Sequence, residues 1–483
     1  MSGNDVEVIS FREKVLEYFS LINQIPRCSG NEKAISDWLV SLAKSHNLSV
    51  VQDEALNIII RVPGTAEYKD KPGIILQGHM DMVCVKDQNI SHDFKKDAIE
   101  MYEDGDWLRA KGTTLGADNG IALAIALAVA TDERIAHPPL ELLFTTDEER
   151  GLSGAKILEK NLLNGKYLLN LDSEDEGVFT IGCAGGRETH IELTLEFEDN
   201  LQDLPTFEID IYKLSGGHSG IQIGQQKPNA IQLVSRLLYR LANELVDFHL
   251  IGLNAGVAHN AIPTNAIVEF SCTQELYAKN IIEDFFTILE KEYRESEPDM
   301  VLSFRKIDTC DRYITADISR KITNILMSLP HGVLKMTPQF GLVETSNNLA
   351  QACILDYKFR VLLSQRSSMP SQHEFITQKI EAIARLAGAE IFIGSGYPAW
   401  QPDWHSYLLE KSTLAYKKIF NKEPKIEVIH AGLECGVIGA KYPEMEMISF
   451  GPTIVTPHTS KERLKISDID KIILLLIELF KSL

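Results

Sequence analysis

The sequence predicts an α/β protein in which an inserted α+β domain interrupts an open mixed-sheet domain. Three apolar segments, 74–81, 140–149 and 167–172, each end in a cluster of His, Asp or Glu, and a helix rich in small residues lies between the first two. This alternation is typical of an open α/β sheet, whose functional sites lie beyond the carboxyl ends of the strands. From residue 186 onward, segments with alternating polar and apolar residues predict antiparallel strands and therefore a second domain.

The N-terminal segment is expected to form two helices and a strand. Helical periodicity over 11–25 predicts the first helix, which a proline ends. Ser29 or Asn31 can cap a second helix that runs through Ser45. Alternation of apolar residues over 50–62 predicts one strand.

The domain organisation is predicted from the change of pattern along the chain. We expect a first domain formed by residues 1–185 and 396–483, with an inserted domain at 186–395. The inserted domain is expected to contain two similar units of sheet and helix, because strands and helices recur in a similar order. The second unit is expected to begin with the strand 300–307 and to end with the strand 390–393.

The charge balance limits the partners of the protein. Among 483 residues, 48 are Lys or Arg and 68 are Asp or Glu, which gives a formal net charge of −20. Such a surplus repels a phosphate backbone or an anionic membrane, so we expect neither nucleic acid nor a membrane as a partner. The longest apolar runs, 121–130 and 472–477, are shorter than the ~18 residues that a membrane-spanning helix needs.

The cysteines and the first residues bear on the cellular compartment. Seven cysteines are scattered along the chain without a Cys-x-x-Cys pair. An odd, scattered set is more typical of a reducing compartment than of a disulfide framework. The start of the sequence lacks a basic segment followed by an apolar one, so no secretory signal is expected. We therefore expect a cytoplasmic protein whose cysteines are free thiols.

Five side chains at or after strand ends define the expected site. They are His79, Asp118, Glu149, Asp172 and His458. Each one alone has an ordinary structural explanation, such as a polar pair, a helix cap, a solvated acidic turn or a loop histidine. Together, two imidazoles and three carboxylates can hold two divalent cations that share one carboxylate, and zinc suits this mixture best. Two metals about 3.5–4 Å apart activate a water and polarise a carbonyl for amide hydrolysis.

Neighbouring carboxylates are expected to support this site. In an extended strand, Asp81 projects to the same side as His79 and can orient it as a metal ligand. The successive acids 147–149 follow an apolar strand, where neighbours point to opposite faces. One glutamate of this group can therefore serve as a ligand and another as a base.

Five ordered motifs connect these residues to a known family. They are Gly78–Val83, Gly112–Ala122, Thr146–Gly151, Leu171–Glu174 and Gly182–Gly186. Their residues resemble the co-catalytic zinc peptidases, which include carnosinases, tripeptidase T and acetylornithine deacetylase. With Leu433–Gly436 and Ser449–Thr453, the motifs are most similar to the dipeptidase branch of that family, which acts on aminoacyl-histidine dipeptides among others.

The resemblance implies a metal-binding role for the five side chains. Asp118 is expected to bridge two divalent ions, zinc by preference, or cobalt or manganese. His79 and Asp172 would complete one metal site. Glu149 and His458 would complete the other.

The resemblance also implies the remaining catalytic residues. Asp81 is expected to orient His79, and Glu148 is expected to be the general base that activates a zinc-bridging water. A cis peptide bond is expected after the bridging residue, between Asp118 and Asn119.

The inserted domain corresponds to the substrate-binding lid of the family. The matching positions are His218, Asn260 and Arg366. By similarity, His218 would stabilise the tetrahedral oxyanion. Asn260 and Arg366 would bind the terminal carboxylate of the substrate.

These observations lead to the hypothesis of a dinuclear zinc dipeptidase whose substrates include Xaa-His dipeptides. A tripeptidase or an N-acyl amino-acid deacylase of the same fold is the alternative within the enzyme class. A catalytically dead peptide or amino-acid binder is the alternative from another class, and the complete ligand set argues against it. The expected partners are dipeptide substrates, and the sequence leaves a homodimer open.

Overall fold

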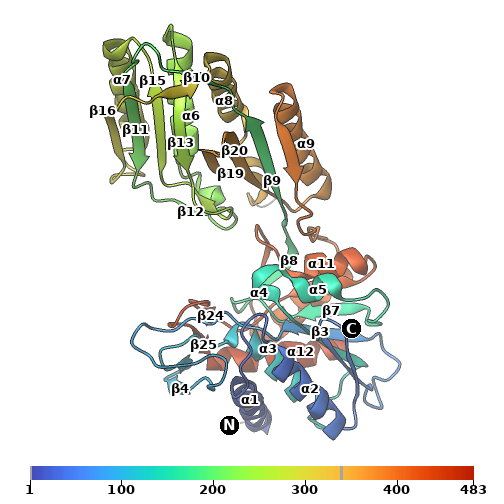
Figure 1. The fold of residues 1–483 in the computed structure, drawn as a ribbon. Coiled ribbons are helices and arrows are strands. Elements are labelled where there is room, and N and C mark those ends of the chain that lie inside the picture. The colour runs from blue at the N-terminus through green and yellow to red at the C-terminus, as the bar shows by residue number, and fades with distance from the viewer. Residues whose placement is uncertain (1–2, 338–340) are drawn as a thin grey trace. The chain divides into compact units, whose positions relative to one another are not determined.

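The computed structural model describes residues 3–337 and 341–483, and the chain divides into two compact units (Figure 1). The first unit comprises Met1–Cys183, Trp400–Val428 and Leu433–Leu483, and the second comprises Ala184–Ala399 and Ile429–Gly432. The chain therefore passes between the units close to the boundaries expected at 185 and 396. The expectation did not include the short excursion at 429–432, which groups with the second unit.

A mixed sheet of eight strands forms the centre of the first unit, in the order β1-β2-β6-β3-β7-β23-β8-β22. Its strands are β1 (Ser49–Gln52), β2 (Ile58–Val62), β3 (Ile74–His79), β6 (Leu140–Thr145), β7 (Tyr167–Asn170), β8 (Val178–Cys183), β22 (Lys425–Ile429) and β23 (Glu446–Ser449). Strand β3 is parallel to both of its neighbours, β6 and β7. All three are buried along their whole length, as is typical of parallel strands covered on both faces. The predicted mixed α/β sheet is confirmed.

Eight helices of the described residues belong to this unit. They are α1 (Gly3–Asn23), α2 (Lys33–Ser45), α3 (Ala117–Ala130), α4 (Glu148–Gly151), α5 (Ser153–Ile157), α10 (Tyr407–Phe420), α11 (Glu434–Lys441) and α12 (Ile466–Ser482). Helix α3 is the small-residue helix, and it packs against β3 and α1. A Cβ atom on Gly78 would collide with the side chains of Asn119 and Ala122, so glycine permits the close approach of β3 and α3.

A second, smaller sheet completes the first unit. Its order is β24-β25-β5-β4, with β4 at Met101–Asp104, β5 at Trp107–Ala110, β24 at Ile454–Val455 and β25 at Arg463–Lys465. The loop between β24 and β25 carries His458.

The structure corrects two expectations for the N-terminal segment. The single strand expected at 50–62 is two antiparallel strands, β1 and β2. A turn separates them, in which the carboxylate of Asp53 accepts hydrogen bonds from the N–H groups of Ala55 and Asn57. Neither Ser29 nor Asn31 caps α2: the residue before the helix is Glu32, and its side chain makes no cap hydrogen bond.

The second unit contains a nine-stranded antiparallel sheet, in which β18 pairs with β19 beside the main order β16-β11-β15-β13-β19-β20-β9-β21. The strands are β9 (Gly185–Thr194), β11 (Thr206–Tyr212), β13 (His249–Ala255), β15 (Ala266–Ser271), β16 (Val301–Ile307), β18 (Gly332–Met336), β19 (Val343–Leu355), β20 (Lys358–Ser367) and β21 (Glu390–Ile393). The long helices are α6 (Ala230–Glu244), α7 (Glu275–Tyr293), α8 (Ala316–Ser328) and α9 (Pro370–Leu386). Apolar residues from these helices and from every one of these strands except β18 share one continuous core.

Within the second unit, this sheet is built from two β-α-β-β-α-β subdomains of the same topology. One consists of β11, α6, β13, β15, α7 and β16, and the other of β9, α8, β19, β20, α9 and β21. Strands β13 and β19 pair and thereby join the two subdomains. The subdomain β11–β16 is inserted, along the chain, between β9 and α8 of the other subdomain.

This nesting corrects the expected start of the second sheet-and-helix unit within the inserted domain. We expected that part to begin at the strand 300–307, but this strand is β16, which pairs with β11 and completes the inserted subdomain. Strand β9 supplies the missing strand, since it pairs with both β20 and β21. Element order along the chain does not distinguish consecutive units from nested ones, because both produce the same alternation of strands and helices.

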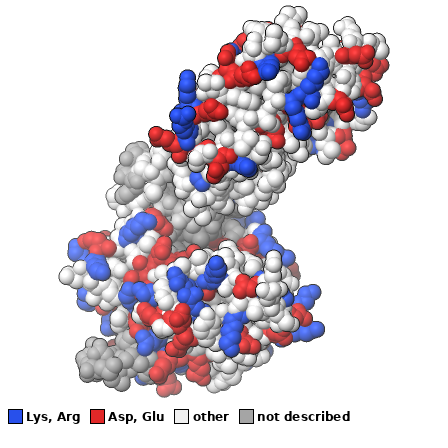
Figure 2. Space-filling model, turned by 90° about the vertical axis from the view of Figure 1, so that its left-hand side faces the viewer, with Lys and Arg blue, Asp and Glu red and all other residues white. Residues whose placement is uncertain are grey.

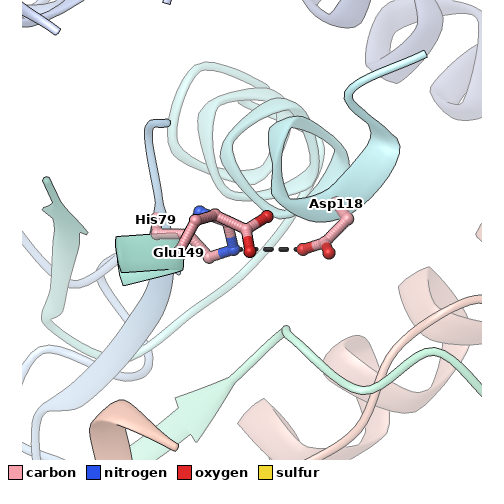
Figure 3. A group of neighbouring side chains, drawn as sticks. All are labelled: His79, Asp118 and Glu149. Atoms are coloured by element: carbon pink, nitrogen blue, oxygen red, sulfur yellow. Dashed lines mark hydrogen bonds and ion pairs between the residues drawn. The ribbon is translucent and has the colours of Figure 1, made fainter. Parts of the chain in front are cut away.

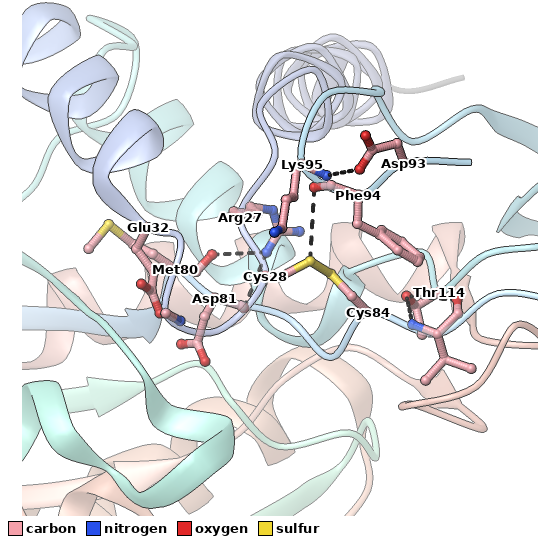
Figure 4. Close-up of a disulfide and its surroundings, with 12 residues drawn as sticks. Arg27, Cys28, Glu32, Met80, Asp81, Cys84, Asp93, Phe94, Lys95 and Thr114 are labelled. Carbon is pink, nitrogen blue, oxygen red and sulfur yellow. Dashed lines mark hydrogen bonds between the residues drawn. A yellow bond between two sulfur atoms is a disulfide. The ribbon is translucent and has the colours of Figure 1, made fainter. Parts of the chain in front are cut away.

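The expectation that every cysteine is a free thiol is wrong for one pair. Cys28 and Cys84 form a disulfide, with their Cα atoms 5.7 Å apart (Figure 4). The other five cysteines, at 183, 272, 310, 353 and 435, are free. The pairing could not be predicted from spacing, because 56 residues separate the two positions in sequence. The cysteine pattern therefore no longer supports a reducing compartment.

Among the helices within 3–337 and 341–483, none is both long and apolar enough to span a bilayer. On the face shown in Figure 2, acidic and basic side chains are interspersed on both units. The negative surplus is therefore not confined to one exposed patch on that face.

Candidate metal centre

The parallel strands of the first unit bring their functional side chains to one edge of the sheet. His79 ends β3, Glu148 and Glu149 open the short helix after β6, and Asp172 follows β7. Because β3 lies between β6 and β7 and is parallel to both, the carboxyl ends of the three strands meet. Asp118 reaches the same edge from the start of α3, across the cis peptide bond that joins it to Asn119.

The two oxygens of Asp118 face two different histidines. Oδ1 lies 3.0 Å from Nε2 of His79, and Oδ2 lies 3.0 Å from Nε2 of His458. Each histidine also faces a second carboxylate: Asp172 is 3.5 Å from His79, and Glu149 is 3.1 Å from His458. The structure thus brings all five expected side chains together as two sets that share Asp118. Figure 3 shows His79, Asp118 and Glu149 pointing toward one another from separate elements.

The two histidines are held in different ways. His79 is almost fully buried on a central strand, whereas the side chain of His458 is half exposed. His458 lies in the loop between β24 and β25 and has a positive φ of 59°. That conformation is unusual for a residue other than glycine, so the rest of the loop must hold it.

The electrostatics of the two imidazoles show an excess of negative charge around them. Burial alone would lower the pKa of His79, but Asp172, Asp118 and Asp81 outweigh it and raise that pKa well above its ordinary value. Hydrogen bonds with Asp118 and Glu149 raise the pKa of His458 to about 11. The negative charge around both imidazoles is the kind that bound cations would balance.

Burial disfavours the charged form of the remaining carboxylates of the site. Loss of solvent raises the pKa of Asp172 to about 6 and that of Glu148 well above its ordinary value. Oε1 of Glu149 is buried and has no hydrogen-bond partner. Buried carboxylates with unused oxygens are costly unless a cation pairs with them. The donor set, two imidazole nitrogens and three carboxylates, therefore fits two divalent ions of the zinc type.

Asp81 connects His79 to the helix that carries the two glutamates. Its carboxylate lies 3.4 Å from Nδ1 of His79 and accepts hydrogen bonds from the N–H groups of Glu148 (3.1 Å) and Glu149 (3.3 Å). These interactions hold the pKa of Asp81 at about 2, although burial alone would raise it. An ionised Asp81 can therefore orient His79 and the start of α4 together.

Some buried groups near the site had no role in the sequence-based prediction. Glu434, at the start of α11, accepts hydrogen bonds from Gln77 and Thr145, both at 2.6 Å. Its other oxygen has no partner, and burial raises its pKa to about 7. Glu434 belongs to the Leu433–Gly436 motif, which was the only signal for it in the sequence. Two more such residues, Arg27 and Glu462, bind backbone groups around the metal ligands.

The three expected substrate-binding residues all lie in the second unit. His218 lies on the two-residue strand β12 (Gly217–His218), and its Nδ1 accepts hydrogen bonds from the N–H groups of Gly220 and Ile221, both at 3.2 Å. The proton of a neutral His218 is therefore placed on Nε2. The Asn260 carbonyl accepts a hydrogen bond from the N–H group of Ser219, beside His218.

Arg366 is a buried cation near His218. It lies on β20, its exposed fraction is 8%, and it donates a hydrogen bond of 2.8 Å to the hydroxyl of Tyr397. Its Nε has no partner. Burial lowers the pKa of His218, and the positive charge of Arg366 lowers it further. The structure thus places a neutral imidazole and an incompletely paired guanidinium in the same part of the second unit.

The comparison with known proteins defines the class of this protein. The model of peptidase family M20/M25/M40 matches residues 75–482, and the chain belongs to this family. The match includes the whole set of metal-ligating candidates and the whole of the second unit.

Relatives of known name cover nearly the whole chain. The cytosol non-specific dipeptidase of Escherichia coli (strain K12) is 37% identical over 470 residues, which are 97% of each chain. The crystal structure of aminoacylhistidine dipeptidase from Vibrio alginolyticus has a TM-score of 0.91 and 36% identity, and covers 97% of this chain and 96% of that one. The structure of aminopeptidase PepT from Bacillus cereus matches with a TM-score of 0.56 at 15% identity, over 98% of both chains, and shows the fold alone.

Proposed function

We propose that the protein is a dipeptidase that requires two divalent metal ions, zinc by preference, with cobalt or manganese as alternatives. The observation that carries this proposal is Asp118, whose two carboxylate oxygens each lie 3.0 Å from a different histidine. His79 and Asp172 are the remaining ligands of one ion, and His458 and Glu149 those of the other. Two cations at these ligands would polarise the substrate carbonyl and lower the pKa of a water.

Glu148 is the general base of the proposed reaction. It is adjacent to the ligand Glu149, and burial raises its pKa well above its ordinary value, so its carboxylate is a stronger base than an exposed glutamate. Its carboxylate accepts the proton of the attacking water and then donates it to the leaving amine. Asp81 keeps both glutamates in place through its bonds to their N–H groups.

The second unit supplies the groups that bind the substrate. Arg366 and Asn260 bind the terminal carboxylate, and the unpaired Nε of Arg366 offers a donor for it. His218 donates from Nε2 to the oxygen that becomes negative when the carbonyl is attacked. A neutral His218 keeps this donor without adding a second full charge beside Arg366.

The choice of dipeptides is supported by the relatives. The two proteins that match over nearly the full length, at 37% and 36% identity, are named as dipeptidases. By the same analogy, Xaa-His dipeptides are among the substrates and the protein acts in the cytoplasm. Neither nucleic acid nor a membrane is part of the proposed function.

A substrate panel tests this proposal. Purified protein supplied with Zn²⁺ is assayed against Xaa-His dipeptides, other dipeptides, tripeptides and N-acetyl amino acids. We expect kcat/KM to be highest for dipeptides with a free carboxylate. A preference for tripeptides or acetylated amino acids would contradict the dipeptidase assignment, and binding of dipeptides without hydrolysis would show a binding protein.

A further inference from the structure

One buried carboxylate, that of Glu462, accepts hydrogen bonds from four consecutive backbone N–H groups. Its Oε2 lies 2.8 Å from the nitrogen of Leu115 and 3.0 Å from that of Gly116. Its Oε1 lies 2.7 Å from the nitrogen of Ala117 and 3.2 Å from that of Asp118. The residue is 2% exposed. We call residues 115–118 the ligand turn, because Asp118 is the shared metal ligand.

The ligand turn is held on its other side by Arg27. The guanidinium donates to the carbonyl of Gly116 at 2.6 Å and to that of Met80 at 3.0 Å. Figure 4 shows Arg27 directed at the backbone next to Met80 and Asp81. Arg27 therefore connects the ligand turn to the end of β3, where His79 lies.

Glu462 connects the same turn to the second histidine. It immediately follows residues 456–461, which we call the His458 loop, and its own N–H group donates to the carbonyl of Thr459 at 3.1 Å. Within the loop, Thr456 donates through its hydroxyl to the carbonyl of Lys461 at 2.8 Å. The loop is thus closed on itself and attached to the ligand turn through the side chain of Glu462.

The two histidines depend on these attachments to different degrees. His79 lies on β3, which pairs with two neighbouring strands, so its position does not depend on the hydrogen bonds of Arg27 alone. His458 lies on no strand or helix and is half exposed. The pairing of β24 with β25 and a hydrogen bond from Ser460 to Asp87 hold the ends and the tip of the His458 loop. Glu462 is the side chain that attaches this loop to the ligand turn itself, and so to Asp118.

We infer that Glu462 is a positioning residue for the metal site formed by His458, Glu149 and Asp118. The inference rests on the proposed dinuclear site and adds to it that the two metal positions are built with separate supports. Glu462 does not contact the metal. It fixes the spacing between a bridging ligand and a loop histidine that lie 340 residues apart in sequence.

The substitution Glu462→Gln tests this role with little change in volume. The amide has one accepting oxygen and one NH₂ group, and the NH₂ group cannot accept from the N–H donors that face it. Some of the four donors lose their acceptor, so the attachment is weakened. Loss of a group that orients a metal ligand typically weakens metal binding by about 10- to 100-fold.

Zinc binding to the metal-free full-length protein is the measurement, by equilibrium dialysis against Zn²⁺ with metal analysis. For Glu462→Gln, we expect one equivalent to bind as in the wild type and the other to bind about 10- to 100-fold more weakly. Glu444→Gln, an exposed glutamate with the same change of charge, is the control and should bind both equivalents normally. In a His458→Ala background, Glu462→Gln should weaken zinc binding no further.

The outcomes separate this inference from the proposed function. Unchanged binding of both equivalents, equal weakening of both, or further weakening in the His458→Ala background would overturn the role of Glu462. If Glu462→Gln does not fold, Glu462→Asp is measured instead, since it keeps both oxygens on a shorter side chain. It should weaken the same single equivalent by a smaller factor, and normal binding would again overturn the role. A wild-type protein that binds fewer than two Zn²⁺ would contradict the dinuclear site itself.

Discussion

Carboxylates that are neighbours in the folded chain have pKa values shifted in opposite directions because their surroundings differ. Asp81 accepts two backbone N–H groups and faces an imidazole, so its pKa is about 2. Glu148 is buried among other acids, and its pKa is raised well above the ordinary value. Pairs of acids whose pKa values are pushed apart are typical of acid–base catalysis. This difference supports the proposal that Asp81 is a fixed anion and that Glu148 is the group that moves a proton.

The role of Glu148 predicts a loss of turnover without a loss of metal. Glu148→Gln removes the base but keeps the size of the side chain and the Asp81 contact to its N–H group. We expect kcat to fall by about 10²- to 10⁴-fold, the usual contribution of a general base. Steady-state kinetics and zinc analysis of the same preparation check this. Turnover close to the wild-type value would assign the base to another residue.

The role of Arg366 predicts a loss that depends on the substrate carboxylate. A hydrogen bond to a charged group contributes about 1.5–3 kcal/mol, so Arg366→Ala should lower kcat/KM for a dipeptide by about 10- to 100-fold. The same dipeptide with an amidated C-terminus lacks the carboxylate and should lose much less. Tyr397→Phe removes the hydroxyl that Arg366 contacts and is the matched control. Equal losses on both substrates would show that Arg366 does not bind the carboxylate.

At the scale of elements, periodicity predicted where strands and helices lie better than how they pair. The apolar runs before His79, Glu149 and Asp172 are strands β3, β6 and β7, as expected. The strand expected over 50–62 is interrupted by a turn, in which Asp53 accepts hydrogen bonds from backbone N–H groups. The alternation did not reveal this turn, and in β2 consecutive isoleucines are buried rather than alternate ones. In the nine-stranded sheet, the nesting of one subdomain inside the other depends on how β9 and β16 pair. These strands are far apart in sequence, and their residues do not indicate which strands they pair with.

The disulfide is an element-scale prediction for stability. It joins the segment that carries Arg27 to the segment that follows β3, and it closes a separation of 56 residues. Replacing both Cys28 and Cys84 by Ser should destabilise the first unit by about 2–4 kcal/mol. Chemical unfolding of the oxidised protein and of the double variant measures the difference. Cys353→Ser, at a free cysteine, is the control. Equal unfolding midpoints for the double variant and the wild type would contradict the prediction.

At the scale of the whole molecule, the ligand set could be predicted because each ligand follows a recognisable strand or turn. The bonds that hold the ligands could not. Glu462 reaches the ligand turn across 347 residues, and it binds backbone groups that carry no sequence signature. Arg27 likewise donates to carbonyls whose side chains are irrelevant to the contact. The sequence motifs thus predict the residues that could hold metal ions, whereas the hydrogen bonds that position these residues are seen only in the folded chain.

The net charge of −20 has two parts at this scale. The first part consists of exposed acids, which are interspersed with basic side chains on the face shown in Figure 2. A second group is buried or partly buried around the candidate metal centre: Asp81, Asp118, Glu148, Glu149, Asp172, Glu174, Glu434 and Glu462. Burial raises the pKa of Glu174 to about 8. Divalent ions would relieve the repulsion within this group, so metal binding and the stability of the first unit are expected to be linked.

Metal content and activity measured on the same samples test the central claim most directly. The protein is stripped with a chelator, dialysed, and titrated with Zn²⁺ while dipeptide hydrolysis and bound zinc are both recorded. The account predicts negligible hydrolysis in the stripped protein and recovery that is complete at two zinc ions per chain. Full dipeptidase activity in protein shown to contain no metal, or full recovery with a single bound ion, would contradict it.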